Sequence, residues 1–361
     1  MVKNGLDVMT LSIGDGANDV AMIQEADVGV GIAGEEGRQA VMSSDFAIGQ
    51  FRFLQRLVLV HGRWSYRRLA ETISNFFYKN MIWTWAIFWY QCFCNFDIAY
   101  IFEYTYIIMF NLFFTSVPVI LMGVLDQDVS DTVSLAVPQL YRRGIERKEW
   151  TQTKFWIYMI DGVYQSVMSF FIPFIFVILT PTAAGNGLDV SERTRLGAYI
   201  AHPAVITING YILINTYRWD WLMLLSIVLS DVFIFFWTGV YTATTYSAGF
   251  YQTAPQVYQE LTFWMCLIVT PALCLLPRMV VKCIQKQRFP YDVDIIREQA
   301  NRGDFAVADA AAAAALGGPE RVEGESLGSL SSSGKGSGRS KKSKHQQYAS
   351  VDEDRRPIYP P

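Results

Sequence analysis

The chain has 361 residues, of which 52% are hydrophobic and 17% are charged. Soluble domains carry about 25% charged residues, and the apolar residues here are concentrated between about residues 76 and 284, which excludes an ordinary soluble protein. The net charge of −3 is small, and we expect no nucleic-acid partner. The five cysteines are too few and too scattered for a disulfide framework, and we expect them to pack as small apolar side chains.

The N-terminal segment "LDVMTLSIGDGANDVAMIQEADVGVGI" (6–32) has the pattern of a strand, a turn, a helix and a second strand. We predict strands over 8–13 and 27–32 and a helix over 18–25, which together form one βαβ-like unit of a parallel sheet. The G-x-G-x-x-G pattern at 29–34 falls within the second strand, so we do not interpret it as a dinucleotide-binding loop.

Two carboxylates, Asp15 and Asp19, follow the first strand at the edge where open α/β sheets bind ligands. Such a pair can hold Mg²⁺ through one or two direct bonds while water and phosphate oxygens complete the octahedron. Gly14 and Gly16 allow a tight turn and close approach of a phosphate, to which Asn18 could donate a hydrogen bond. The alternative is a capped turn without a metal.

Six apolar stretches approach the roughly 20 residues that a helix needs to cross a bilayer. They cover about 76–97, 104–125, 155–179, 196–217, 220–241 and 260–282. Their interiors carry few charged or titratable residues: Lys79 lies near the start of the first stretch, and Asp161, His202 and Asp231 lie within the later ones, whereas Arg278 lies near the end of the sixth. For the two acids we expect hydrogen bonds between helices.

Basic residues indicate the orientation, because they favour the cytosolic side. They cluster at 52–68, 142–154 and 278–288, whereas the loops 97–103 and 242–260 contain none. We therefore predict a multi-pass integral membrane protein with the N-terminal segment and the C-terminal tail in the cytosol.

The tail from about residue 303 is rich in alanine, then in glycine and serine, and we expect it to be disordered. Its basic stretch "GRSKKSKH" (338–345) is either part of a solvated linker or a contact for anionic lipid.

The string "GDGANDVAMI" (14–23) resembles the hinge motif of the P-type ATPases, whose phosphorylation domain belongs to the haloacid dehalogenase-like superfamily. The sequence that follows, including "NFFYKNMIWTWAIFWYQ" (75–91), resembles the type IV subfamily, the phospholipid flippases, and the fungal plasma-membrane type in particular. The resemblance covers roughly residues 4–295. It implies a fragment of an α/β phosphorylation domain (1–65), a membrane domain with six helices (66–290) and a cytosolic tail, largely disordered (291–361).

The resemblance also implies a function: ATP-driven movement of phospholipid from the exoplasmic to the cytosolic leaflet through a Mg²⁺-dependent aspartyl phosphate. A two-span glycosylated β-subunit is the expected partner, in a plasma, endosomal or Golgi membrane. The phosphorylated D-K-T-G-T motif of the family does not occur in this sequence. We therefore expect the C-terminal quarter to third of a flippase, as a fragment or a truncated gene model, and expect the isolated chain to be inactive.

The same resemblance assigns roles to individual residues. Asp15 would be a direct Mg²⁺ ligand, Asp19 would support the metal and the catalysis, and Asn18 would lie near the aspartyl phosphate.

In the membrane, Lys79 and its neighbour Asn80 would handle the phospholipid, although a lysine at this depth could also reach the headgroups by snorkelling. Asn111, Thr115 and Ser116 would continue the lipid path, with Asn111 and Thr115 on one helix face and Pro118 freeing backbone carbonyls. The cores of the first two stretches contain no acidic residue, which favours a lipid over an ion as the transported species. The second interpretation is therefore a cation-transporting P-type ATPase, and the third is a non-catalytic membrane protein.

Overall fold

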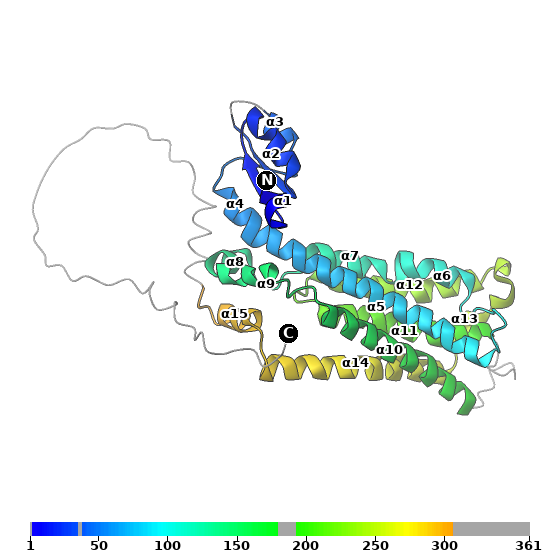
Figure 1. Ribbon diagram of the computed structural model, residues 1–361. Coiled ribbons are helices and arrows are strands. Elements are labelled where there is room, and N and C mark those ends of the chain that lie inside the picture. The colour runs from blue at the N-terminus through cyan, green and yellow to red at the C-terminus, as the bar shows by residue number, and fades with distance from the viewer. Residues whose placement is uncertain (1, 35–37, 180–192, 306–361) are drawn as a thin grey trace, which may run out of the picture. The chain divides into compact units, whose positions relative to one another are not determined.

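The N-terminal part of the chain forms the predicted parallel sheet. The computed structural model describes residues 2–34, 38–179 and 193–305. The sheet has three parallel strands in the order β1-β2-β3: β1 (Leu11–Gly14), β2 (Val28–Ile32) and β3 (Phe46–Ile48). Beside it lie four short helical elements (Figure 1): α1 (Val2–Leu6), the 3₁₀ turn η1 (Ala17–Asp19), α2 (Val20–Glu25) and α3 (Gln39–Met42). The βαβ unit is thus confirmed, and a third strand, which the sequence analysis did not predict, extends it.

Glycines in β2 allow the helices to pack closely on the sheet. A Cβ atom on Gly29 would lie 2.6 Å from a methyl group of Ile23 in α2, and one on Gly31 would lie 2.9 Å from the carbonyl oxygen of Ala40 in α3. Both separations are too short for real side-chain contacts. The G-x-G spacing at this point therefore serves helix–sheet packing, in agreement with our rejection of a dinucleotide-binding loop.

The remainder of the described chain is helical. After α4 (Phe53–Arg56) and the π-helical segment η2 (Leu57–Gly62), the elements are α5 (Arg63–Phe93), α6 (Tyr104–Met109), the π-helical segment η3 (Phe110–Phe114), α7 (Ser116–Leu125), α8 (Asp131–Ala136), η4 (Pro138–Tyr141), α9 (Arg142–Ile145), α10 (Gln152–Leu179), α11 (Arg193–Asn215), α12 (Trp221–Thr242), η5 (Thr245–Phe250), α13 (Thr253–Tyr258), α14 (Leu261–Arg288) and α15 (Asp292–Asn301).

Five helices of the described residues are long and apolar enough to cross a membrane: Tyr104–Leu125, Gln152–Leu179, Arg193–Asn215, Trp221–Thr242 and Leu261–Arg288. They match five of the six predicted stretches. The first predicted stretch, 76–97, lies in α5 up to Phe93, where that helix ends; α5 is 31 residues long but is not among the five. The reason lies in its composition, since tryptophan, tyrosine and the polar pair Lys79-Asn80 lower its hydropathy. Large apolar side chains remain exposed along α12 and α14, as expected of an integral membrane protein.

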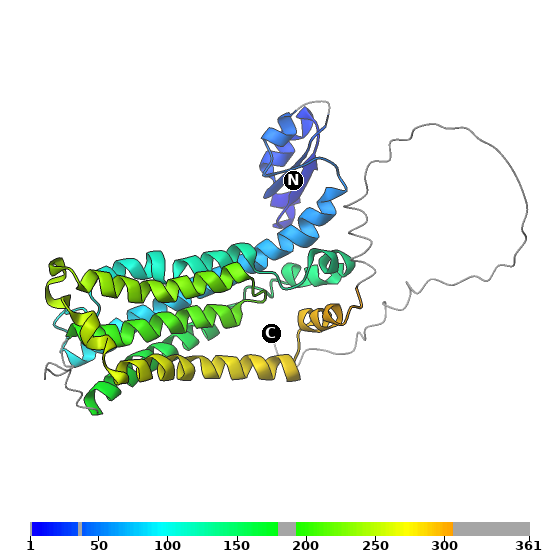
Figure 2. The ribbon, with the colours of Figure 1, turned by 180° about the vertical axis from the view of Figure 1, so that it is seen from behind.

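Helix α11 occupies the interior of the helical bundle. It packs against α14, α10 and α12, and most of its residues are buried, whereas α5 packs against α10 and α7 (Figures 1 and 2). Gly197 permits a close contact near the start of α11, because a Cβ atom there would lie 2.3 Å from the carbonyl oxygen of Ile101. Side chains from all of these helices form one continuous hydrophobic core.

The predicted tail begins with an ordered helix. In α15, Val293 is buried against Val129, Val133 and Leu140, which follow α7 in the chain. Residues 306–361, including the basic stretch 338–345, lie outside the described residues.

Candidate functional site

The loop after β1 is organised by Asp19. The Oδ2 atom of Asp19 accepts hydrogen bonds from the backbone N–H groups of Asp15 (3.2 Å) and Gly16 (3.3 Å). Gly14 lies beneath this side chain, because a Cβ atom at that position would be only 2.3 Å from the Cβ atom of Asp19. Asp19 therefore closes the turn, and the loop fits around it only if residue 14 is glycine.

Asp15 and Asn18 have exposed side chains at the carboxyl end of β1. The two predicted metal ligands thus differ: Asp19 is committed to backbone amides through one oxygen, whereas Asp15 projects from the loop. Among the residues that the structure describes, no group of three or more His, Cys, Asp or Glu side chains could hold a metal ion. One or two carboxylates are what Mg²⁺ takes when phosphate and water supply the other ligands, so the loop fits a partial magnesium site.

Lys79 lies in the interior of the bundle with a side chain that does not reach the surface. The residue is 1% exposed. Its Nζ atom donates hydrogen bonds to the hydroxyl oxygens of Thr115 (3.2 Å) and Ser116 (3.1 Å). Snorkelling to the headgroups is therefore excluded for this conformation. Within the described chain, Lys79 forms no ion pair with an acid, so both of its hydrogen-bond partners are neutral.

Thr115 and Ser116 lie where the second predicted membrane helix is interrupted. The π-helical segment η3 ends at Phe114, and Thr115 has non-helical angles (φ −138°, ψ −12°) before α7 begins. The Thr115 hydroxyl donates to the carbonyl oxygen of Phe110 (2.7 Å), and the Ser116 hydroxyl donates to that of Asn111. Both side-chain bonds reach a carbonyl five residues earlier, which the wider turn of the π-helical segment brings close.

The π-turn also overturns one expectation. Thr115 is buried but Asn111 is exposed, so the two do not share a helix face. The prediction assumed an α-helix, in which residues four apart are aligned, whereas a π-turn aligns residues five apart. Asn80 also lies apart from the lysine contacts, because its side-chain amide donates to the carbonyl oxygen of Phe76 in its own helix (2.9 Å). Of the five predicted path residues, the structure joins Lys79, Thr115 and Ser116 directly.

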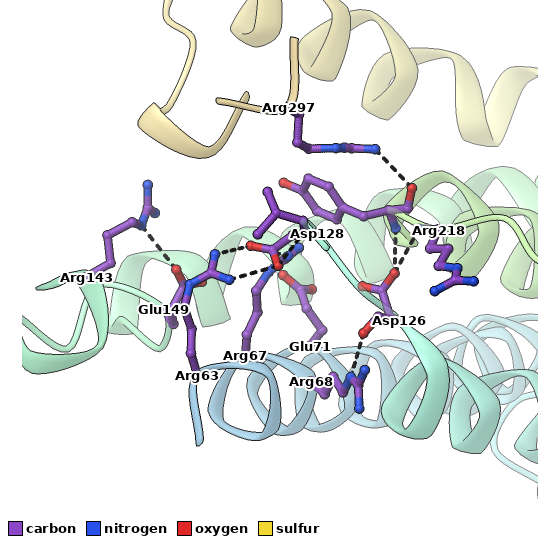
Figure 3. Close-up of polar contacts among 12 residues, drawn as sticks. Arg63, Arg67, Arg68, Glu71, Asp126, Asp128, Arg143, Glu149, Arg218 and Arg297 are labelled. Carbon is purple, nitrogen blue, oxygen red and sulfur yellow. Dashed lines mark hydrogen bonds and ion pairs between the residues drawn. The ribbon is translucent and has the colours of Figure 1, made fainter. Parts of the chain in front are cut away.

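The sequence analysis missed a buried ion-pair cluster where α5 meets the segment after α7. Figure 3 shows Arg63 and Arg67 of α5 directed at Asp128, whose carboxylate also accepts from the backbone of Val129 (2.9 Å). Arg67 Nη1 lies 2.9 Å from Asp128 Oδ2. The available signal was the i,i+4 spacing of the two arginines, which we used only to orient the chain.

The cluster extends to the ends of α7 and α11. Asp126 Oδ1 accepts from the backbone N–H groups of Tyr217 (2.8 Å) and Arg218 (3.0 Å), and Arg68 donates to the Asp126 carbonyl oxygen (Figure 3). Arg297 of α15 donates to the carbonyl oxygen of Tyr217 (3.2 Å). One network of polar contacts therefore connects α5 to the C-terminal ends of α7 and α11, which we predict to face the cytosol.

Glu71, one turn beyond Arg67, forms a second buried contact. It accepts hydrogen bonds from Lys154 Nζ (2.6 Å) and the hydroxyl of Tyr158 (2.7 Å) in α10. Burial alone would raise the pKa of Glu71, but the Lys154 ammonium and these hydrogen bonds outweigh it and hold the pKa at about 2. The carboxylate is therefore ionised throughout the physiological range.

The two acids of the later helices bond to neighbouring helices, as predicted. Asp161 of α10 accepts from the hydroxyl of Tyr211 (2.8 Å) and lies 3.3 Å from Arg278 Nη1 of α14. Asp231 of α12 accepts from the amide of Asn209 in α11 (2.6 Å).

Comparison with known proteins places these features in a family. Residues 41–291 match the family described as "Phospholipid-translocating P-type ATPase C-terminal". The chain is 98% identical over its whole length to 23% of phospholipid-transporting ATPase DNF1 of Chaetomium thermophilum. Over 84% of its length it is 57% identical to 19% of phospholipid-transporting ATPase DNF2 of Saccharomyces cerevisiae, and over 82% it is 39% identical to 20% of human phospholipid-transporting ATPase VA.

The chain thus spans about a fifth to a quarter of the length of these relatives. The family match covers the helical bundle and the ion-pair cluster, and the relative with 98% identity also covers the sheet and its loop. The chain belongs to the phospholipid-translocating P-type ATPases, as the C-terminal part of a fungal type IV enzyme.

Proposed function

We propose that the intact protein containing this chain uses ATP to move phospholipid from the exoplasmic to the cytosolic leaflet. The relatives are named phospholipid-transporting ATPases, and the chain carries the C-terminal membrane region of that family. The observation that carries the proposal is the environment of Lys79: a buried ammonium that faces two hydroxyl groups and no carboxylate of the described chain.

A buried cation without a counter-ion is costly, and a ligand that brings its own negative charge removes that cost. The phosphate of a phospholipid is such a ligand, and the Thr115 and Ser116 hydroxyls can add hydrogen bonds to it. An ion pump would instead require oxygen ligands with negative charge close to the cation. The Lys79 site therefore favours a phospholipid over a metal cation as the transported species.

At the sheet, we infer that Asp15 coordinates Mg²⁺ directly, that Asp19 supports the site by closing the loop, and that Asn18 donates to the phosphoryl group. Mg²⁺ supplies charge neutralisation for transfer of a phosphoryl group from ATP to an aspartate elsewhere in the intact protein. Asp15→Asn should raise the Mg²⁺ concentration for half-maximal ATPase activity by at least tenfold. An unchanged requirement would remove Asp15 from the metal site.

The partner and the location follow from the same family membership. We propose a two-span glycosylated β-subunit as partner, a plasma, endosomal or Golgi membrane as location, and a cytosolic position for the sheet and for the C-terminal end. We also propose that this chain by itself hydrolyses no ATP, because its sequence lacks the D-K-T-G-T motif.

The deciding experiment is a set of ATPase assays on the intact protein that contains this chain. Lys79→Ala should lower phospholipid-stimulated hydrolysis at least tenfold without loss of phosphoenzyme formation. Lys148→Ala is the matched control, because that lysine is exposed and lies in a surface ion pair with Glu146 (2.5 Å). Stimulation by Na⁺, K⁺ or Ca²⁺ instead of phospholipid would favour a cation pump, and absence of any hydrolysis would favour a non-catalytic membrane protein.

A further inference from the structure

The carbonyl oxygen of Phe114 has lost its regular donor. In an α-helix this oxygen would accept from the N–H group of residue 118, which here is a proline and has none. The structure supplies a replacement from another helix: the Asn209 side-chain amide of α11 donates to the Phe114 oxygen at 3.1 Å. Phe114 and Asn209 are both fully buried, so water cannot take over this bond.

The Asn209 amide is itself held by a third helix. Its Nδ2 atom also donates to Asp231 Oδ1 of α12 at 2.6 Å. Both amide hydrogens are therefore used. The reverse amide orientation would direct Oδ1 at a carboxylate and a carbonyl oxygen, which repel it. Asp231 thus fixes which way the amide faces.

We propose that Asn209 and Asp231 are positioning residues for the lipid path, and this inference rests on the proposed function. Asp231 orients the Asn209 amide, Asn209 holds the Phe114 carbonyl, and the next two residues, Thr115 and Ser116, are thereby kept in hydrogen-bonding reach of Lys79.

Asn209 affects the position of Thr115 through the backbone of Phe114. Thr115 follows Phe114 directly and has non-helical backbone angles, so its hydroxyl direction depends on the peptide unit that Asn209 holds. Without that bond the buried Phe114 carbonyl would lose the donor that α11 supplies, and the interrupted segment could relax by rotating the peptide. Rotation would carry the Thr115 hydroxyl away from the Lys79 ammonium, to which it now lies at 3.2 Å.

The test is a double-mutant cycle in the intact protein that contains this chain, with phosphatidylcholine and phosphatidylserine each titrated as the stimulating lipid. Asn209→Leu, which keeps the volume but donates nothing, should raise the half-saturating lipid concentration about three- to tenfold with phosphoenzyme formation unchanged. In a Thr115→Ala background the same substitution should add less than a twofold change, because the hydroxyl that Asn209 positions is already absent.

Two further variants separate positioning from folding. Asp231→Asn still offers an oxygen to the amide and should stay within twofold of the wild type, whereas Asp231→Leu should behave like Asn209→Leu. Thr207→Val is the matched control, since this buried hydroxyl of the same helix donates to the carbonyl oxygen of Pro203 (2.7 Å) and lies beside the thiol of Cys274, and it should also stay within twofold.

The remaining outcomes would overturn either this inference or the proposed function. Equal effects of Asn209→Leu with and without Thr115, or an effect of Thr207→Val as large as that of Asn209→Leu, would overturn the inference. If Asn209→Leu does not fold, equal loss in Asp231→Asn and Asp231→Leu overturns it instead. Failure of the wild-type enzyme to respond to either lipid would contradict the proposed function, whereas additive effects in a lipid-stimulated enzyme would contradict only this inference.

Discussion

Asp128→Asn should destabilise the helical bundle more than any surface substitution. The Asp128 side chain is 0% exposed, and its partners Arg63 and Arg67 have side chains that are only 9% and 10% exposed. Burial alone would raise the pKa of Asp128, but the two guanidinium groups outweigh it and hold that pKa below its ordinary value, so the carboxylate is ionised at neutral pH. Asparagine would leave two buried cations facing a neutral group.

Removing one partner of a buried ion pair costs about 3–5 kcal/mol. Asparagine keeps one acceptor oxygen, so we expect the lower end, about 3 kcal/mol. A domain of 150–250 residues loses about 2–4 °C for each kcal/mol and a longer chain loses less, so the midpoint temperature should fall by at most about 6–12 °C.

Thermal unfolding of the detergent-solubilised protein, followed by loss of monodisperse material, measures this shift. Glu146→Gln is the control, because its partner Arg142 has a side chain that is 80% exposed and such pairs contribute at most about 1 kcal/mol. Equal midpoints for Asp128→Asn and Glu146→Gln would refute the argument that burial makes the Asp128 cluster structurally important.

Two other predictions concern the sheet loop and the second buried acid. Gly14→Ala should abolish Mg²⁺-dependent phosphate release in the intact enzyme, because the new Cβ atom would lie 2.3 Å from the Cβ atom of Asp19. Gly16→Ala should retain this activity, because its Cβ atom would have no neighbour closer than 3.9 Å. Comparable rates for the two variants would contradict the steric argument. Because the folded-state pKa of Glu71 is lowered from 4.5 to about 2, the stability that its Lys154 contact contributes is complete above about pH 4.5 and is lost as the pH falls toward 2. Thermal midpoints measured down this range should therefore fall more in the wild type than in Glu71→Gln, and parallel curves would show that the contact contributes nothing.

The sequence was a good guide wherever a feature depends on neighbours in the chain. The strand–turn–helix–strand pattern over residues 6–32 predicted the βαβ unit, and the absence of an N–H group in Pro118 predicted a freed carbonyl in the second membrane helix. The placement of Asn111 beside Thr115 was wrong because a single π-turn changes the residues that share a face. Pro118 marks an interruption of this helix in the sequence, but it does not by itself distinguish a π-turn from a kink in a regular helix.

The buried ion pairs could not be predicted for the same reason. Arg63 and Asp128 are 65 residues apart, and Glu71 and Lys154 are 83 apart. Charged residues near the ends of membrane helices ordinarily face water, and that was the interpretation that the sequence supported. Only the packing of α5 against α7 and α10 shows that these side chains are removed from solvent.

Helix α5 contacts the second membrane helix and the segment after it at several points, of which two polar contacts lie far apart. Arg67 holds Asp128 at one point, and Lys79 contacts Thr115 at the other. Along α5 the points are 12 residues or about 18 Å apart. Along the antiparallel partner they are 13 residues apart, of which the last three follow the end of α7 and are not helical. A shift of α5 along this neighbour would strain the Lys79–Thr115 and Arg67–Asp128 contacts together. Thr115 directly follows the carbonyl that Asn209 holds, so the Asn209 bond lies next to the point where such a shift would act.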